Sequence, residues 1–202
     1  VTVRDKNDPE NSVTCYKESP AHSVHLAVIT EVSHLSWKVQ EEGLTIFETE
    51  NKFAEIKEKP NYKNLIVAVA VGLSCAGLCL FSLGDSVNAL VAFVAAFIGF
   101  LIKNFFTQKN YNPMICITIG AFITTLITGL GSIYKIGGNP EAAMATAVLY
   151  LIPGVPLINC VIDLIEGYLS SAINRALFGG FILLCIAAGM TLCITLLGIS
   201  NF

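Results

Sequence analysis

The run Leu65-Ile-Val-Ala-Val-Ala-Val-Gly-Leu-Ser-Cys-Ala-Gly-Leu-Cys-Leu-Phe-Ser-Leu83 contains no charged side chain over 19 residues. A helix of this length crosses the hydrocarbon core of a bilayer, which is about 30 Å thick. Four further apolar stretches follow, over residues 86–102, 113–130, 142–162 and 176–199. The sequence therefore predicts an α-helical membrane protein with five transmembrane helices.

Charge is distributed unevenly along the 202-residue chain. Residues 1–63 hold 19 of the 27 charged residues, and residues 64–202 hold only eight. We therefore expect a polar domain over residues 1–63 and a membrane domain over residues 64–202. The net charge is −3 and no basic cluster occurs. This excludes an electrostatic surface for nucleic acid, which requires clustered Lys and Arg to neutralise phosphates.

The polar segment combines strand and helix patterns. Residues 1–3 and 12–16 are rich in strand formers and flank a dense cluster of turn formers, which predicts a β-hairpin. Residues 25–39 carry apolar side chains three and four apart, and Thr45 with Glu48 forms a capping-box pattern for a second helix. This indicates a small α+β domain. Because so few elements make a marginal core, we expect it to be truncated and to begin upstream of Val1.

Positively charged residues near the spans define the expected orientation. One side of the membrane receives all but one of them, and only Lys135 falls on the other. The first group is Lys52, Lys57, Lys59, Lys63, Lys103, Lys109 and Arg175. By the positive-inside rule, we expect a multi-pass protein of the inner (plasma) membrane whose polar segment is cytoplasmic and whose Phe202 faces out. An odd number of spans also allows an inverted relative to complete a two-fold repeat.

The fourth apolar stretch contains Pro153, Gly154 and Pro156 near its middle. Each proline removes a backbone hydrogen bond at a depth where an unsatisfied group is costly. One interpretation is a simple kink. The other is a discontinuous helix whose second half points free N–H groups at an anionic substrate group. Asn159 and Asp163 are four apart and lie on one face of that second half.

Further polar residues are candidates for the same site. Asp163 is either a carrier of a coupled proton or a helix-end residue in the headgroup region, and both alternatives stay open. Thr124, Thr125 and Thr128 of the third span, and Ser74 of the first, either line the path or bond their own helix backbone. We include Pro153, Gly154, Pro156, Asn159, Ser74, Thr124 and Thr128 as substrate-binding candidates, and Asp163 as the proton-coupling candidate.

Three segments resemble the threonine/serine exporter family of the ThrE type. They are Val71-Gly-Leu-Ser-Cys75, Leu151-Ile-Pro-Gly-Val-Pro-Leu-Ile-Asn159 followed by Asp163, and Val28-Ile-Thr-Glu-Val32. The chain is similar in particular to the five-span larger subunit of split, two-component members. The resemblance implies a secondary exporter of small carboxylates, such as threonine, serine or succinate, that works with a smaller membrane subunit.

Other classes of protein are less well supported. A non-transporting scaffold or regulatory subunit remains the alternative, because a small-residue helix bundle serves either role. An enzyme is not expected, since the chain has no nucleophile elbow and no carboxylate pair facing a common core. No cofactor or metal is expected either. His22 and His25 are three apart but lack a second Cys/His pair at ligand spacing.

Overall fold

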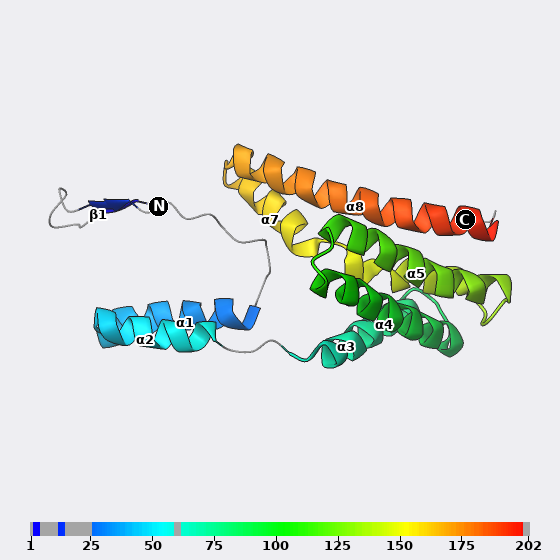
Figure 1. Ribbon diagram of the computed structural model, residues 1–202, viewed down its shortest axis with the longest axis horizontal. Helices are drawn as coiled ribbons and strands as arrows, with labels where there is room; N and C mark the ends of the chain where they lie inside the picture. Colours follow the sequence, from blue (N-terminus) through cyan, green and yellow to red (C-terminus); the bar gives the residue numbers. More distant parts are fainter. Residues whose placement is uncertain (1, 5–11, 15–25, 59–61, 200–202) are drawn as a thin grey trace. The chain divides into compact units, whose positions relative to one another are not determined.

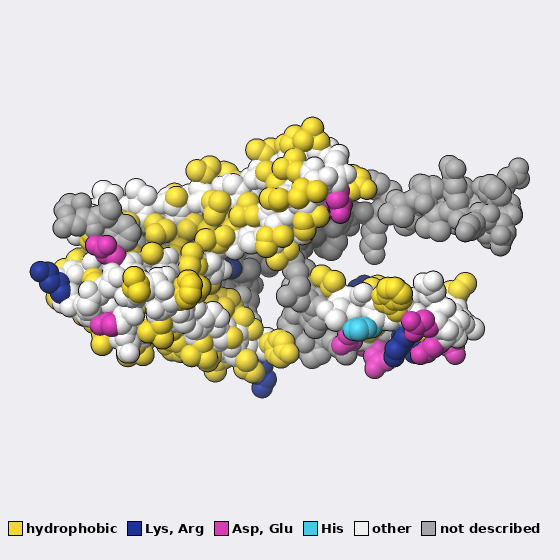
Figure 2. Space-filling model, turned by 180° about the vertical axis from the view of Figure 1, so that it is seen from behind, with side chains coloured by type: hydrophobic (Ala, Val, Ile, Leu, Met, Phe, Trp, Pro, Cys, Tyr) yellow, Lys and Arg dark blue, Asp and Glu magenta, His cyan; other side chains and the backbone are white. Residues whose placement is uncertain are grey.

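The computed structural model describes residues 2–4, 12–14, 26–58 and 62–199. The chain divides into two compact units, Val1–Asn61 and Tyr62–Phe202 (Figure 1). In Figure 2, charged side chains gather on the helical pair of the first unit, and hydrophobic side chains cover the visible face of the second. The contrast in charge between the two parts of the sequence is therefore also a contrast between two structural units.

The first unit contains a strand pair and a helix pair. Strand β1 (Thr2–Arg4) pairs antiparallel with β2 (Ser12–Thr14), and α1 (Leu26–Glu42) packs against α2 (Ile46–Lys57). These pieces do not support the expected α+β domain. The strands have three residues each, and the only residues buried in the described part of this unit are Leu35 and Ile56, on the helix pair.

The start of α2 is fixed by a local hydrogen-bond exchange. The Thr45 hydroxyl accepts from the Glu48 backbone N–H at 3.3 Å, and the Glu48 carboxylate accepts from the Thr45 backbone N–H at 3.0 Å. These two bonds satisfy donors that a helix start otherwise leaves unpaired, and they hold the pKa of Glu48 below its usual value. The predicted capping box is confirmed.

The second unit consists of long apolar helices and one bent helix pair. Within the described ranges, four helices are long and apolar enough to cross a membrane: α3 (Asn64–Phe81), α4 (Ser86–Gln108), α5 (Pro113–Ile133) and α8 (Leu169–Leu197). Between α5 and α8 lie α6 (Pro140–Ala147), the 3₁₀ turn η1 (Leu149–Leu151) and α7 (Gly154–Ile165), bent by 68°. The predicted helical membrane protein is confirmed, with four spans, or five if the bent pair counts as one.

Two helices extend beyond their apolar stretches. The sequence predicts spans at residues 86–102 and 176–199, whereas α4 continues to Gln108 and α8 begins at Leu169. Hydropathy marks where the apolar surface ends, but a helix continues until its backbone is capped. The extended end of α4 has Lys109 as its C-cap, and the extended start of α8 has Tyr168 as its N-cap. The extensions place Lys103 and Arg175 inside helices rather than in loops.

Small side chains allow close packing around α6. This half-helix contacts α3, α4 and α5. Helices α5 and α7 both pack on α8 (Figure 1). The core beside α6 is built almost entirely from alanines: Cys79, Ala89, Ala92, Ala95, Ala142, Ala143 and Ala147. Small residues let membrane helices approach closely without a hydrophobic driving force. The bundle therefore surrounds the first half of the bent pair.

Asp85 ties the start of α4 to the loop before α6. Its carboxylate accepts from the backbone N–H groups of Asn88, at 2.8 Å, and Gly138, at 2.9 Å. These bonds lower the pKa of Asp85 from its ordinary 3.8. A carboxyl with a lowered folded-state pKa stabilises the fold above 3.8, and this contribution disappears as the pH falls through the folded-state value.

We expect Asp85→Ala to lower the melting temperature of the purified protein at neutral pH by roughly 2–4 °C, because the cap and the loop bond are lost together. The difference from wild type should shrink as the pH falls below 3.8. Thermal unfolding in detergent between pH 7 and pH 3 checks this. A difference that is the same across that range would contradict the role assigned to the Asp85 carboxylate.

Candidate functional site

The break in the bent pair lies where the sequence predicts it. The 3₁₀ turn η1 ends at Leu151, and α7 begins at Gly154 with Pro153 as its N-cap and without a side-chain cap. Pro156, in the first turn of α7, has no N–H to donate. Beyond the break, α7 packs closely on α8. A Cβ added at Gly179 of α8 would lie only 2.9 Å from Leu157 Cδ2 of α7. The two halves therefore have different surroundings.

A buried hydrogen bond lies one turn before the break. The Thr124 hydroxyl of α5 lies 3.2 Å from the Tyr150 hydroxyl of η1. Thr124 is fully buried and donates its single proton to the Gly120 carbonyl at 2.8 Å, so the Tyr150 hydroxyl is the donor to Thr124. Gly99 of α4 packs directly against this hydrogen bond. A Cβ added at Gly99 would meet Thr124 and lie 2.7 Å from the Tyr150 oxygen. Helices α4, α5 and η1 thus meet at one polar point.

Lys103 of α4 borders the same point. A Cβ on Gly120 would lie 3.2 Å from Lys103 Cβ and 3.5 Å from the Tyr150 oxygen. The Lys103 ammonium has no hydrogen-bond or ion-pair partner among the described residues. Sequence reasoning did not include Lys103 or Tyr150 among the site candidates, and it counted Lys103 only as a positive charge near the end of a span. The signal for Lys103 was its position four residues after Gly99, on the small-residue face of α4.

The predicted serine and threonine candidates have different surroundings. Thr128 is buried and donates to the Thr124 carbonyl at 3.1 Å, whereas the buried Thr125 hydroxyl finds no partner among the residues that the structure describes. Ser74 is exposed and donates to the Ala70 carbonyl at 2.9 Å. The neighbouring Cys75 of α3 faces α6, with its thiol 3.8 Å from the Ala147 carbonyl. The structure therefore brings Thr124, but not Ser74, next to Tyr150.

Asp163 lies near the other end of α7, about 14 Å along the helix from the break. Its carboxylate accepts from the Ser171 hydroxyl at 2.7 Å and lies 3.3 Å from Arg175 Nε. Both partners belong to the first turns of α8, so Asp163 joins the end of α7 to the start of α8. Asn159, one turn earlier, is half-buried. The Asn159 and Asp163 pair is thus separated from the Tyr150 contact.

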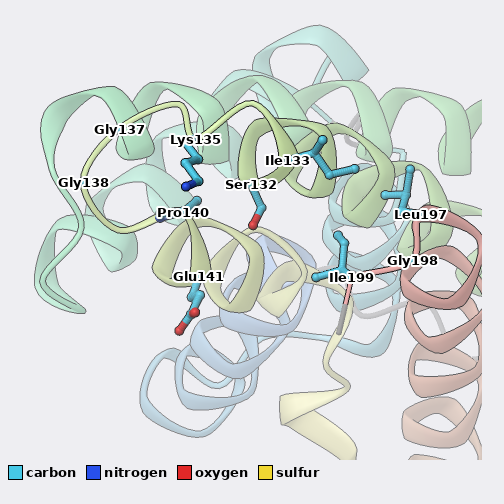
Figure 3. Close-up of a pocket in the computed structure, with 10 residues that line it drawn as sticks. All are labelled: Ser132, Ile133, Lys135, Gly137, Gly138, Pro140, Glu141, Leu197, Gly198 and Ile199. Carbon is cyan, nitrogen blue, oxygen red and sulfur yellow. The ribbon is translucent and has the colours of Figure 1, made fainter. Parts of the chain in front are cut away.

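A separate hollow of about 480 Å³ lies between the ends of α5 and α8 and the start of α6. Its polar lining includes Ser132, Lys135 and Glu141, and none of the predicted site residues lines it. Figure 3 shows the Glu141 carboxylate pointing away from Lys135. Within the described ranges no group of three metal-ligating side chains occurs, and His22 and His25 lie outside those ranges.

Comparison with known proteins identifies the family. The model of the family described as "Putative threonine/serine exporter" (ThrE) matches residues 1–197. The chain belongs to the ThrE family. This ThrE chain is therefore a multi-pass membrane protein of a transporter family, as the resemblance implied.

Two curated relatives of this ThrE chain are each named "Probable succinate transporter subunit YjjP". The protein from Klebsiella aerogenes is 30% identical over 191 residues, which are 94% of this chain and 74% of the relative. The protein from Escherichia coli K12 is 29% identical over the same length and the same shares. No solved structure matches the chain.

Proposed function

We propose that this chain is one subunit of a secondary transporter that exports small carboxylates, such as threonine, serine or succinate, across the inner membrane. The observation that carries the proposal is the match of the exporter family over residues 1–197. The two relatives are both named "Probable succinate transporter subunit", and this name favours a carboxylate cargo. The broken helix pair adds physical support, since discontinuous helices commonly form substrate sites in secondary transporters.

The partner in this proposal is a smaller membrane subunit of the same family. Both relatives are named as subunits, which supports a complex of more than one chain. An odd number of spans lets a related unit insert in the inverted orientation and form the second half of the transporter. The positive-inside rule supports a cytoplasmic first unit and an outward-facing end of α8.

The substrate site in this proposal is the broken fourth span. Pro153, Gly154, Pro156 and Asn159 belong to α7 and the turn before it, where the two prolines supply no N–H and the Gly154 N–H donates to the Ile152 carbonyl at 2.9 Å. Thr124 and Thr128 approach from α5, and Thr124 contacts Tyr150 directly. Ser74 lies on an exposed face of α3, so its participation requires the partner subunit to cover that face.

The experiment that tests the function is efflux of labelled threonine, serine and succinate from cells. The cells express the full-length protein alone, the smaller subunit alone, or both. Efflux that requires both chains is the expected result and identifies the substrate. A complex that assembles in the membrane but exports none of the three would favour a scaffold or regulatory subunit instead.

Asp163 is the proposed proton carrier, and its ion pair with Arg175 allows a discriminating test. We expect Asp163→Asn to reduce efflux driven by the proton-motive force by about tenfold or more, because it removes a charged hydrogen-bonding group. The measurement is initial efflux at matched membrane abundance, with Ser171→Ala as the control for lost packing at the same contact.

A charge exchange separates coupling from structure at this pair. The double variant Asp163→Arg with Arg175→Asp keeps opposite charges between α7 and α8 but moves the carboxylate to α8. If Asp163 carries the proton, efflux stays low in the double variant. Restored efflux would show that the ion pair serves only to join the two helices.

A further inference from the structure

Lys103 is a cation within a candidate membrane span, and the described part of the chain offers it no partner. It lies in α4, five residues before the end of the helix at Gln108, and it is only partly exposed. Among the described residues, no carboxylate approaches its ammonium. An ionisable side chain in a membrane helix is costly unless it is paired, hydrated or functional. The adjoining groups therefore indicate what Lys103 can do.

The groups next to Lys103 are hydrogen-bonding and closely packed. Lys103 Cβ and the Tyr150 hydroxyl lie 3.2 and 3.5 Å from the position that a Cβ on Gly120 would occupy. The lysine stem is long and flexible enough for its ammonium to reach that hydroxyl. Leu151 Cδ2 lies 3.6 Å from the same position, so three side chains pack around Gly120. The Lys103 stem and the Tyr150 hydroxyl thus border one point between α4, α5 and η1.

This pair suits a carboxylate ligand. The ammonium supplies charge and up to three donors, and the Tyr150 hydroxyl can turn its proton from the Thr124 oxygen to a carboxylate oxygen. A bound carboxylate would also neutralise Lys103 inside the membrane. The contact lies three residues before Pro153, so a ligand held there touches the segment at which the fourth span breaks.

We propose that Lys103 and Tyr150 form the anchor for the substrate carboxylate, on the α4–α5 side of the break. The inference rests on the proposed export function and deepens it, because it moves the charged contact away from the α7 residues. Lys103 provides the charge, Tyr150 provides the directed hydrogen bond, and Thr124 holds the tyrosine ring in place as a positioning residue.

The test is the substrate dependence of efflux by the two-subunit complex with Lys103→Gln, Lys103→Arg and Tyr150→Phe. Lys103→Gln should raise the apparent KM for the exported carboxylate about ten- to a hundredfold, and Tyr150→Phe about two- to tenfold. Lys103→Arg should keep part of the affinity, because the charge remains. The matched control is Lys109→Gln at the end of the same helix, where Nζ lies 4.5 Å from the centre of the Phe105 ring.

A second readout is stabilisation of the purified complex by added succinate, threonine or serine, measured as a shift in melting temperature. Wild type should shift with the exported compound, and Lys103→Gln should lose the shift. Lys103→Gln with a wild-type KM and a lower abundance would overturn the inference, since Lys103 would then be only an anchor at the membrane surface. A wild-type complex that neither exports nor binds these carboxylates would overturn both this inference and the proposed function.

Discussion

Gly99→Ala is expected to lower both the stability of the complex and its efflux. The added Cβ would meet the Thr124 hydroxyl and lie 2.7 Å from the Tyr150 oxygen, closer than real Cβ atoms approach other groups. Either α4 moves away from α5, or the Thr124–Tyr150 hydrogen bond breaks. Overpacking of this kind costs about 1–3 kcal/mol. The measurements are thermal unfolding of the purified complex and initial efflux at matched membrane abundance.

The matched control is Gly77→Ala on α3. A Cβ at Gly77 would have no neighbour within 4 Å, so this variant tests the effect of a methyl group on a helix without a clash. We expect it to be neutral or slightly stabilising, because alanine favours helix more than glycine does. Equal behaviour of the two variants would show that the contact between α4, α5 and η1 is not tightly packed.

Gly189→Ala should be the most destabilising single substitution of those considered, at about 3 kcal/mol. Gly189 lies where α8 crosses α5. A Cβ added at this position would lie 2.5 Å from the Thr118 carbonyl oxygen and 3.0 Å from Ala121 Cβ. A side chain can rotate away, but a backbone carbonyl moves only with its helix, so α8 and α5 must separate. Thermal unfolding of the complex in detergent measures this cost directly.

Gly180→Ala provides the comparison within the same helix. Gly180 also belongs to α8, but nothing lies within 4 Å of the Cβ that it would gain. Its variant should unfold at the wild-type temperature or above. If Gly189→Ala also unfolds at the wild-type temperature, the α5–α8 crossing must be looser than the structure indicates.

The predicted features that the structure confirms are those encoded by local sequence. Uncharged runs of membrane-spanning length specified the long helices, because a backbone in lipid must satisfy its hydrogen bonds internally. The prolines located the break, since proline cannot donate the bond that an unbroken helix needs. Thr45 and Glu48 defined the start of α2 through contacts only three residues apart. Each of these features depends on neighbours along the chain.

The positions of helix ends were predicted less well. Lys103 and Arg175 were assigned to the edges of spans, but both lie inside helices. The α+β domain expected from the strand patterns was also not supported, because strand-forming residues alone do not specify what covers a hairpin. In both cases the outcome depends on capping and packing rather than on composition.

The sequence by itself determined that this protein is a helical membrane protein whose fourth apolar stretch breaks near Pro153. Only the tertiary structure decided that Lys103, Thr124 and Tyr150 meet around Gly120, and that Asp163 pairs with Arg175. The physical reason is that a membrane helix is apolar on nearly every side, so hydrophobic periodicity does not show which face meets which neighbour. The face that each helix turns to its neighbour depends on where small residues on the two helices allow close approach. Small residues on different helices come together only when the bundle packs.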